Sequence, residues 1–174
     1  MQHIPENLAR RKPLKILVAP HPMLTMTAEP VIAVDQEVRN LIDDMTMTMY
    51  LNKGIGLAAN QIGTLRRVVV IDNTRPGDPT HCIGMVNPVI LKTSIEEEIR
   101  REGCLSFPGY FSEVTRPSGC IVSFLDRAGE PQEMWFTGIV STCIQHEVDH
   151  LDGKLFIEHL SRQQRRDIMR RITR

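Results

Sequence analysis

The residues most suggestive of chemistry form the segment Gln145-His146-Glu147-Val148-Asp149-His150. It places two imidazoles four residues apart, a little over one helical turn, so both can project from one face and bind one metal ion. Glu147 lies about 100° around the helix from His146. That position suits a general base acting on water at the metal, as in hydrolases with the pattern H-E-x-x-H. The alternative is a pair of ordinary histidines at the edge of a surface helix.

The element that must carry this pair is a helix predicted over Gly138–Leu151, with Thr137 as its N-cap and Gly153 at its end. One arc of the helix is apolar and comprises Val140, Cys143, Ile144, Val148 and Leu151. The opposite arc is polar and comprises Ser141, Thr142, Gln145, Asp149 and Asp152. The sequence therefore predicts a core helix whose two histidines lie at the edge of the buried stripe, beside a cleft.

Two histidines leave a catalytic ion short of ligands, so a third ligand is required. Phe156 occupies the position where one metalloprotease pattern has a third histidine, and His159 comes three residues later than that position. Glu158 is too near the helix to reach back easily. We therefore expect the third ligand upstream of the helix.

The upstream candidate is Cys104, which follows a predicted strand at Ile95–Gly103 and precedes the turn signal Pro108-Gly109. Its small neighbour Gly103 leaves room for a ligand. A buried free thiol is the alternative for Cys104, and it is our interpretation of the three cysteines in apolar surroundings, Cys82, Cys120 and Cys143.

A third segment, Gly54 to Gln61, follows an amphipathic helix predicted over Asp35–Asn52. Two glycines separated by one apolar residue, then two alanines, permit close approach of another backbone. A tight turn explains the glycines equally well, and Gln61 could be a solvated polar residue.

Taken together, the three segments Gly54–Gln61, Glu102–Ser106 and Gln145–His150 resemble the peptide deformylase family. The likeness extends from about Leu14 to Leu160. It implies a metal-dependent hydrolase that removes the N-formyl group from the initiator methionine of nascent polypeptides.

The resemblance also implies a role for particular residues. The metal ligands would be Cys104, His146 and His150, with Glu147 as acid and base. The oxyanion would be met by Gln61 and the backbone N–H of Leu105. The peptide would be held through the main chain near Ile55, Gly56, Gly103 and Leu105. The implied ion is Fe²⁺, for which Ni²⁺, Co²⁺ or Zn²⁺ can substitute. One departure is Phe111, where some members carry an arginine, and it concerns contacts with the peptide end.

Composition indicates one domain with a substantial core, since the chain has 174 residues. Lysine plus arginine, at 21, equals aspartate plus glutamate, at 21. This balance favours no particular partner, and we predict neither a membrane nor a DNA partner. Four cysteines without paired spacing suit a reducing cytoplasm, and we predict no signal peptide before Leu14.

The predicted fold class is α+β, with mainly antiparallel sheets around a central metal-binding helix and a C-terminal helix. Strands are expected at Lys15–Val18, Arg67–Asp72, Gly84–Leu91, Ile95–Gly103, Cys120–Asp126 and Gln132–Phe136, the last two joined by a hairpin. The predicted divisions are a polar, mobile N-terminal arm at 1–13, a deformylase-like catalytic domain at 14–160 and a basic C-terminal helix at 161–174.

The C-terminal segment from Arg162 to Arg174 contains six arginines and one acid, Asp167. Leu160, Gln164, Ile168 and Ile172 would form a narrow apolar edge of the predicted helix Ser161–Ile172. Arginines outside that edge can contact RNA phosphates, and in some deformylases such a helix docks on the ribosome. A merely solvated helix is the alternative.

Two other functions use the same residues. A zinc endopeptidase could employ the same His-Glu-His helix, and cleavage of internal rather than blocked peptide bonds would identify it. The other alternative function is a non-catalytic metal-binding or RNA-binding protein. Glu147 and Gln61 disfavour it, because a purely structural site needs neither residue.

Overall fold

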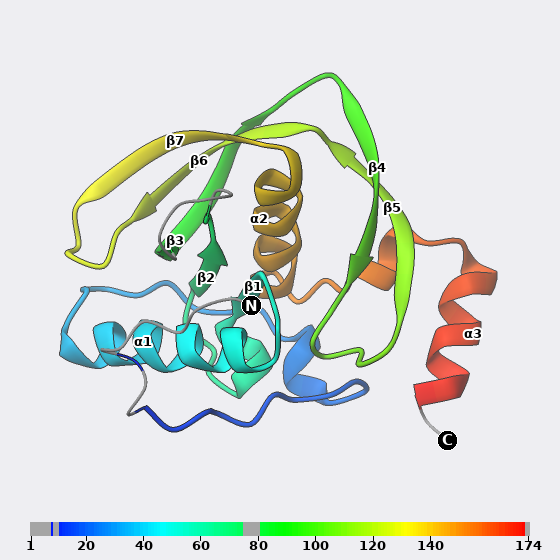
Figure 1. Cartoon of the computed structure of the whole chain (residues 1–174), viewed down its shortest axis with the longest axis horizontal. Helices are drawn as coiled ribbons and strands as arrows, with labels where there is room; N and C mark the ends of the chain where they lie inside the picture. Colours follow the sequence, from blue (N-terminus) through cyan, green and yellow to red (C-terminus); the bar gives the residue numbers. More distant parts are fainter. Residues whose placement is uncertain (1–7, 9–10, 75–80, 173–174) are drawn as a thin grey trace.

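The computed structural model describes residue 8, residues 11–74 and residues 81–172 of the chain (Figure 1). Its helices are α1 (Gln36–Leu51), α2 (Gly138–Leu151) and α3 (Arg162–Ile172), with 3₁₀ turns η1 (Pro22–Thr25), η2 (Ala59–Ile62) and η3 (Phe156–His159). Its strands are β1 (Gly56–Ala58), β2 (Val68–Asp72), β3 (Cys82–Thr93), β4 (Glu97–Gly103), β5 (Phe111–Pro117), β6 (Gly119–Leu125) and β7 (Pro131–Thr137). The expected α+β class with antiparallel sheets is confirmed.

A five-stranded sheet, in the order β1-β2-β3-β6-β7, separates two layers of core. Side chains alternate between the two faces of a strand. Val69 and Ile71 of β2 accordingly join the cluster that packs on α2, whereas Val68 and Val70 join the cluster that packs on α1. All four of these side chains are fully buried. Burial of each one stabilises the fold by about 1.5–3 kcal/mol relative to leaving it exposed.

Helix α2 lies between this sheet and the β4/β5 hairpin (Figure 1). The expected boundaries of α2 are confirmed. On its polar arc only the C-terminal residues reach solvent, since Asp149 is half-buried and Asp152 is exposed. Ser141, Thr142 and Gln145 are all buried. Gln145 donates to the carbonyl oxygen of Pro117 at 2.9 Å, so protein groups replace water on this side. Polar side chains of α2 are buried because the helix is packed on two sides, by the sheet and by the β4/β5 hairpin. A helical wheel does not reveal this second contact.

The strand expected at Lys15–Val18 is wrong, because this segment is extended without belonging to a sheet. Residues in and next to this segment make single backbone hydrogen bonds to two other segments, instead of the repeated hydrogen bonds of a paired strand. Leu17 N–H donates to Gln61 O at 2.7 Å, and Ala19 N–H donates to Ser106 O at 2.9 Å. The segment thereby ties the Gln61 turn to the loop after Cys104.

The other expected strands and helices are present, with boundaries shifted by a few residues. The sequence did not predict β1 and β5, because β1 is three residues long and β5 is mostly polar. Most of the expected N-terminal arm lies outside the described residues. Of its described part, Leu8 is buried, and Arg11 pairs with Asp43 and Asp44 of α1 at 3.0 Å each.

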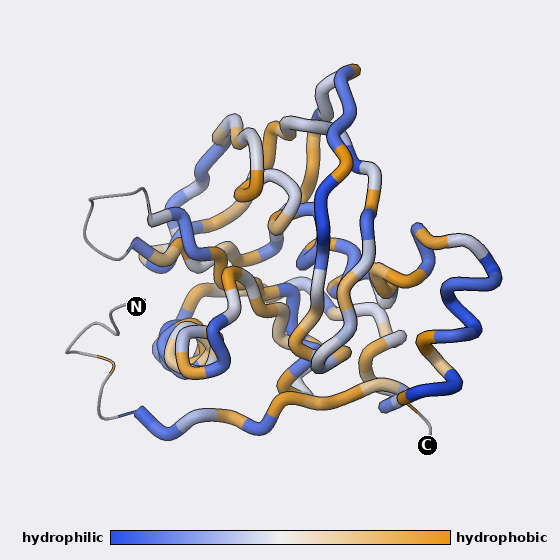
Figure 2. Tube along the Cα trace, turned by 45° about the vertical axis from the view of Figure 1, so that its right-hand side comes forward, coloured by the Kyte–Doolittle hydropathy of each residue, from blue (hydrophilic) through white to orange (hydrophobic). Residues whose placement is uncertain are grey.

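Helix α3 packs on the outer side of the β4/β5 hairpin through Ile168, Met169 and Ile172, which contact a third core cluster containing Phe107 and Phe156. Figure 2 shows the rest of α3 as hydrophilic. The apolar edge differs from the expected one in using Met169, since Gln164 is exposed. Within the described ranges, every helix is too short or too polar to cross a membrane.

Candidate active site

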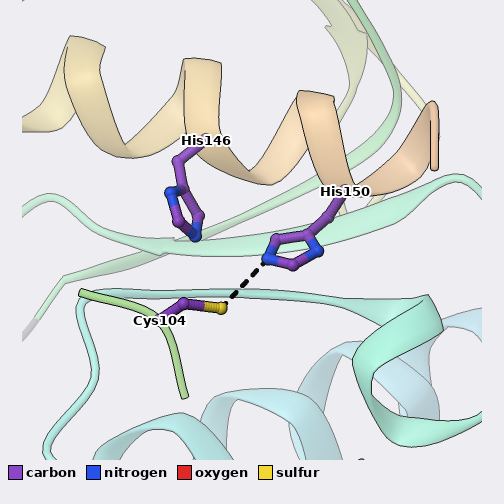
Figure 3. A group of neighbouring side chains, drawn as sticks. All are labelled: Cys104, His146 and His150. Atoms are coloured by element: carbon purple, nitrogen blue, oxygen red, sulfur yellow. Dashed lines mark hydrogen bonds between the residues drawn. The ribbon is translucent and has the colours of Figure 1, made fainter. Parts of the chain in front are cut away.

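Two histidines of α2 point toward a cysteine that follows β4 (Figure 3). The Nε2 atom of His150 lies 3.1 Å from the Sγ atom of Cys104. One ligand atom from each of Cys104, His146 and His150 lies within 4.8 Å of the other two. A thiolate and two imidazoles at this separation fit one transition-metal ion, so the residues brought together match those expected from the sequence.

His146 is oriented by a buried chain of charges that the sequence did not single out. Its Nδ1 atom lies 3.0 Å from Glu102 Oε2, and Arg116 Nε donates to Glu102 Oε1 at 2.6 Å. Arg116 also pairs with Asp149 at 2.8 Å. Burial works to raise the pKa of the Glu102 carboxyl, but the bonds from His146 and Arg116 hold that pKa below its ordinary value. The only signal in the sequence was that Glu102 stands two residues before Cys104.

Glu147 lies in the same cavity and is buried. Burial raises the pKa of its carboxyl to about 7, although the charge of His146 opposes this. Among the described residues, its Oε2 atom has no hydrogen-bond partner. A carboxylate of this pKa with a free oxygen can accept and return a proton near neutral pH.

Gly56 lets β1 approach α2 closely. A Cβ atom at Gly56 would lie 2.5 Å from Glu147 Oε1 and 2.4 Å from Cys143 Sγ, both shorter than real contacts. The close approach expected for this glycine is therefore present, and it places the β1 backbone beside the Glu147 carboxylate.

Gln61 is held rigidly in η2, and the alternative of a solvated side chain is wrong. Its Oε1 accepts a bond from the backbone N–H of Ala58 at 2.8 Å. Its Nε2 lies 3.1 Å from Ser106 Oγ and 3.5 Å from Cys104 Sγ. The side-chain amide of Gln61 therefore donates toward one candidate ligand, Cys104, and toward Ser106.

Asn60 anchors the end of α2, another contact that the sequence did not predict. Its Nδ2 atom donates to the backbone carbonyl of His150, and both residues are fully buried. Phe156, which replaces a histidine ligand in the pattern considered above, packs its ring 6.0 Å from that of His146. His159 instead contacts Asp149 at 2.9 Å, away from the three ligands.

Two of the three candidate ligands, Cys104 and His146, line a cavity of about 840 Å³ together with Gln61 and Glu147. Its two sides are β1, an edge of the five-stranded sheet, and β4, whose second edge is unpaired among the described strands. The cavity is lined by all the residues expected at the peptide, Ile55, Gly56, Gly103 and Leu105. Unpaired strand edges can hydrogen-bond an extended peptide.

A half-buried cysteine with two buried histidines, a carboxylate beside them and a cavity with free strand edges define a metal-dependent hydrolase of peptide substrates. The polypeptide deformylase family model matches residues 13–166. The chain belongs to this family, and it is an enzyme that removes the formyl group from formyl-Met peptides.

Similar proteins support this assignment over most of the chain. The peptide deformylase of Rhizobium meliloti is 44% identical over 94% of this chain and 92% of its own length. That of Phenylobacterium zucineum is 47% identical over 91% of this chain and 94% of its own. A crystal structure of peptide deformylase from Ehrlichia chaffeensis in complex with actinonin is 36% identical, covers 92% of this chain and 96% of that chain, and has a TM-score of 0.88. These matches favour deformylation over the endopeptidase alternative.

Proposed function

We propose that Cys104, His146 and His150 hold one divalent ion, that this ion is Fe²⁺ in the cell, and that Glu147, Gln61 and Leu105 carry the chemistry. The observation that carries the proposal is the convergence of the three ligand atoms within 4.8 Å of one another, next to the cavity that Cys104, His146 and Glu147 line. Thiolate plus imidazole suits several ions, so Ni²⁺, Co²⁺ or Zn²⁺ can occupy the same site.

When bound, the ion would supply Lewis acidity and would lower the pKa of water to about 7. Glu147 takes a proton from the attacking water and returns it to the departing amine. The Nε2 amide of Gln61 and the backbone N–H of Leu105 donate to the oxygen that becomes negative as the formyl carbon is attacked. The unpaired backbone edges near Ile55, Gly56 and Gly103 hold the peptide.

The decisive experiment measures formate release from a formyl-Met peptide under anaerobic conditions, with an internal-bond peptide as the endopeptidase control. Removing a proton-transfer group lowers turnover about 10²–10⁴-fold, and removing an oxyanion donor about 10²–10³-fold. We expect losses of this size in Glu147→Ala and Gln61→Ala with metal retained. Near-normal turnover in either variant contradicts that residue's role.

Metal analysis tests the ligands separately. Cys104→Ala should lose most of its bound metal. Cys82→Ala is the matched control, since Cys82 is also a free thiol but contacts Thr46 at 3.4 Å, on the α1 side of the sheet. Equal metal content in the two variants contradicts the assignment of Cys104.

We also propose that the enzyme acts in the cytoplasm on nascent chains, with α3 contacting ribosomal RNA. The support is the exposure of five α3 arginines, while the apolar residues of the helix face the core: Arg162, Arg165, Arg166, Arg170 and Arg171. Arginine binding to phosphates falls steeply with salt.

Substitution is a sharper test of α3 than deletion, because deletion also uncovers the cluster under Ile168 and Met169. Replacing Arg165, Arg166 and Arg170 by glutamine should weaken ribosome co-sedimentation and flatten its salt dependence, without changing turnover of a short peptide. Unaltered co-sedimentation means that α3 is a solvated helix.

A further inference from the structure

The outer part of the cavity carries a cation stacked on an aromatic ring. Phe111 is the register partner of Gly103 across β4 and β5. A Cβ atom at Gly103 would lie 2.4 Å from the Phe111 ring, so the ring covers the Gly103 backbone directly. The guanidinium carbon of Arg101 lies 4.7 Å from the centroid of the same ring. Stacking of this kind holds a guanidinium in place while leaving its N–H groups available.

The position of this pair explains a departure from the family pattern. Some deformylases have an arginine where this chain has Phe111. Here the aromatic ring stands at that position and the positive charge comes from Arg101 on the neighbouring strand, against the ring. The charge is therefore displaced across the hairpin rather than lost.

The charges that line the cavity are segregated. Its carboxylates, Glu102 and Glu147, are 6% and 4% exposed and lie beside the metal ligands. Its cations are Lys53, Arg100 and Arg101, of which Arg100 is engaged by Glu98. Among the described residues, Lys53 and Arg101 form no ion pair. In a chain whose formal charges cancel, the cavity is thus positive away from the metal site.

The spacing along β4 relates this charge to the substrate. A strand rises about 3.3 Å per residue, so Arg101 lies roughly 7 Å from Gly103 along the strand. A peptide that pairs with the edge of β4 near Gly103 therefore brings its next two or three residues to the level of Arg101. Lys53, at the end of α1, lines the opposite side of the cavity.

We infer that Arg101, held on Phe111, and Lys53 are specificity-determining residues that favour formyl-Met peptides with a carboxylate within the first three residues after the methionine. Peptides with lysine among these three residues are disfavoured, because the lysine is repelled by the positive charges of Arg101 and Lys53. This inference rests on the proposed function, and it names the downstream sequence that the site selects.

The test compares kcat/KM for formyl-Met-Ala-Asp-Ser amide and formyl-Met-Ala-Lys-Ser amide, so that no terminal carboxylate interferes. An exposed charge pair changes binding by about 1.5- to 5-fold. With attraction in one peptide and repulsion in the other, we expect the aspartate peptide to be favoured by roughly 2- to 25-fold at low salt. The ratio should approach one in about 0.5 M salt, where such interactions are screened.

Three variants assign the preference to particular side chains. Arg101→Gln and Lys53→Gln should each reduce the ratio, and Phe111→Leu should reduce it by releasing the guanidinium. Lys92→Gln is the matched control, because Lys92 is an exposed cation on β3 outside the cavity lining. A ratio near one in the unmodified enzyme, or an unchanged ratio in Arg101→Gln, overturns the inference.

Binding separates this inference from the proposed function. The affinities of the Met-Ala-Asp-Ser and Met-Ala-Lys-Ser amides for the metal-loaded Glu147→Ala protein can be compared by calorimetry, without turnover. No formate release from any formyl peptide contradicts the proposed function alone. Equal affinity for both amides contradicts the charge preference alone.

Discussion

The Nδ1 atom of His146 lies 3.0 Å from Glu102 Oε2, and this contact determines which nitrogen of His146 faces the other ligands. A carboxylate accepts hydrogen bonds but does not donate them, so Nδ1 must carry the proton. In the neutral form of His146, the Nε2 atom is then left with its lone pair. Glu102 therefore prepares His146 as a ligand before any ion binds.

Glu102→Gln should weaken metal binding by about 10–100-fold, the usual effect of removing a carboxylate that orients a ligating histidine. Competition with a coloured chelator measures the affinity. Glu98→Gln is the matched control, because Glu98 is on the same strand but its carboxylate contacts Arg100. A thermal melt of the metal-free proteins separates a folding defect from a binding defect, and equal affinities of the two variants contradict the prediction.

Gly56→Ala should lower kcat strongly while leaving the metal bound. The added Cβ meets Glu147 Oε1 at 2.5 Å and Cys143 Sγ at 2.4 Å, so the carboxylate has to move. A displacement of about 1 Å can reduce turnover roughly 10²-fold. Gly54→Ala is a milder comparison, since its nearest contact is the flexible end of Leu105 at 2.9 Å. Equal kcat in both variants would show that Glu147 tolerates the shift.

The iron-loaded enzyme should lose activity in air faster than the nickel-loaded enzyme. Fe²⁺ and the Cys104 thiolate are both oxidisable and would be in direct contact, and thiolate character governs oxidation of cysteine. Activity followed for several hours with and without oxygen tests this for both metal forms. Equal decay rates in air would locate the damage elsewhere in the protein.

Folding stability should decrease above about pH 9, in part because of Cys82. Burial raises the pKa of this thiol from 9.0 to about 11, with Asp72 adding to the increase. A raised folded-state pKa contributes stability that is complete below the unfolded-state pKa and is lost as pH rises toward 11. The loss should be about 1–2 kcal/mol, reduced from the full shift because the side chain is partly exposed.

Urea unfolding at pH 8, 9 and 10 measures this loss of stability. Cys82→Ala should show a shallower decrease than the unmodified chain, although Tyr50 contributes in the same direction because burial raises its pKa as well. If the free energy of unfolding decreases equally with pH in the two proteins, Cys82 makes no contribution.

The helix that carries His146, Glu147 and His150 could be predicted with its boundaries from the sequence, because spacing along a helix is a local property of the chain. The three ordered motifs likewise identified Cys104 and Gln61, which the fold brings to the same cavity. In each of these cases the information lies within a few neighbouring residues.

Only the tertiary structure decided which groups support those residues. Glu102 reaches His146 across 44 positions, and Asn60 reaches the His150 carbonyl across 90. Gln145, on the polar arc of α2, is buried because the end of β5 packs over it and the Pro117 carbonyl accepts its hydrogen bond. The periodicity of the sequence indicates which residues share a face of one helix or strand. What lies against that face depends on how distant segments pack, and that is settled by the burial and hydrogen bonding of the whole chain.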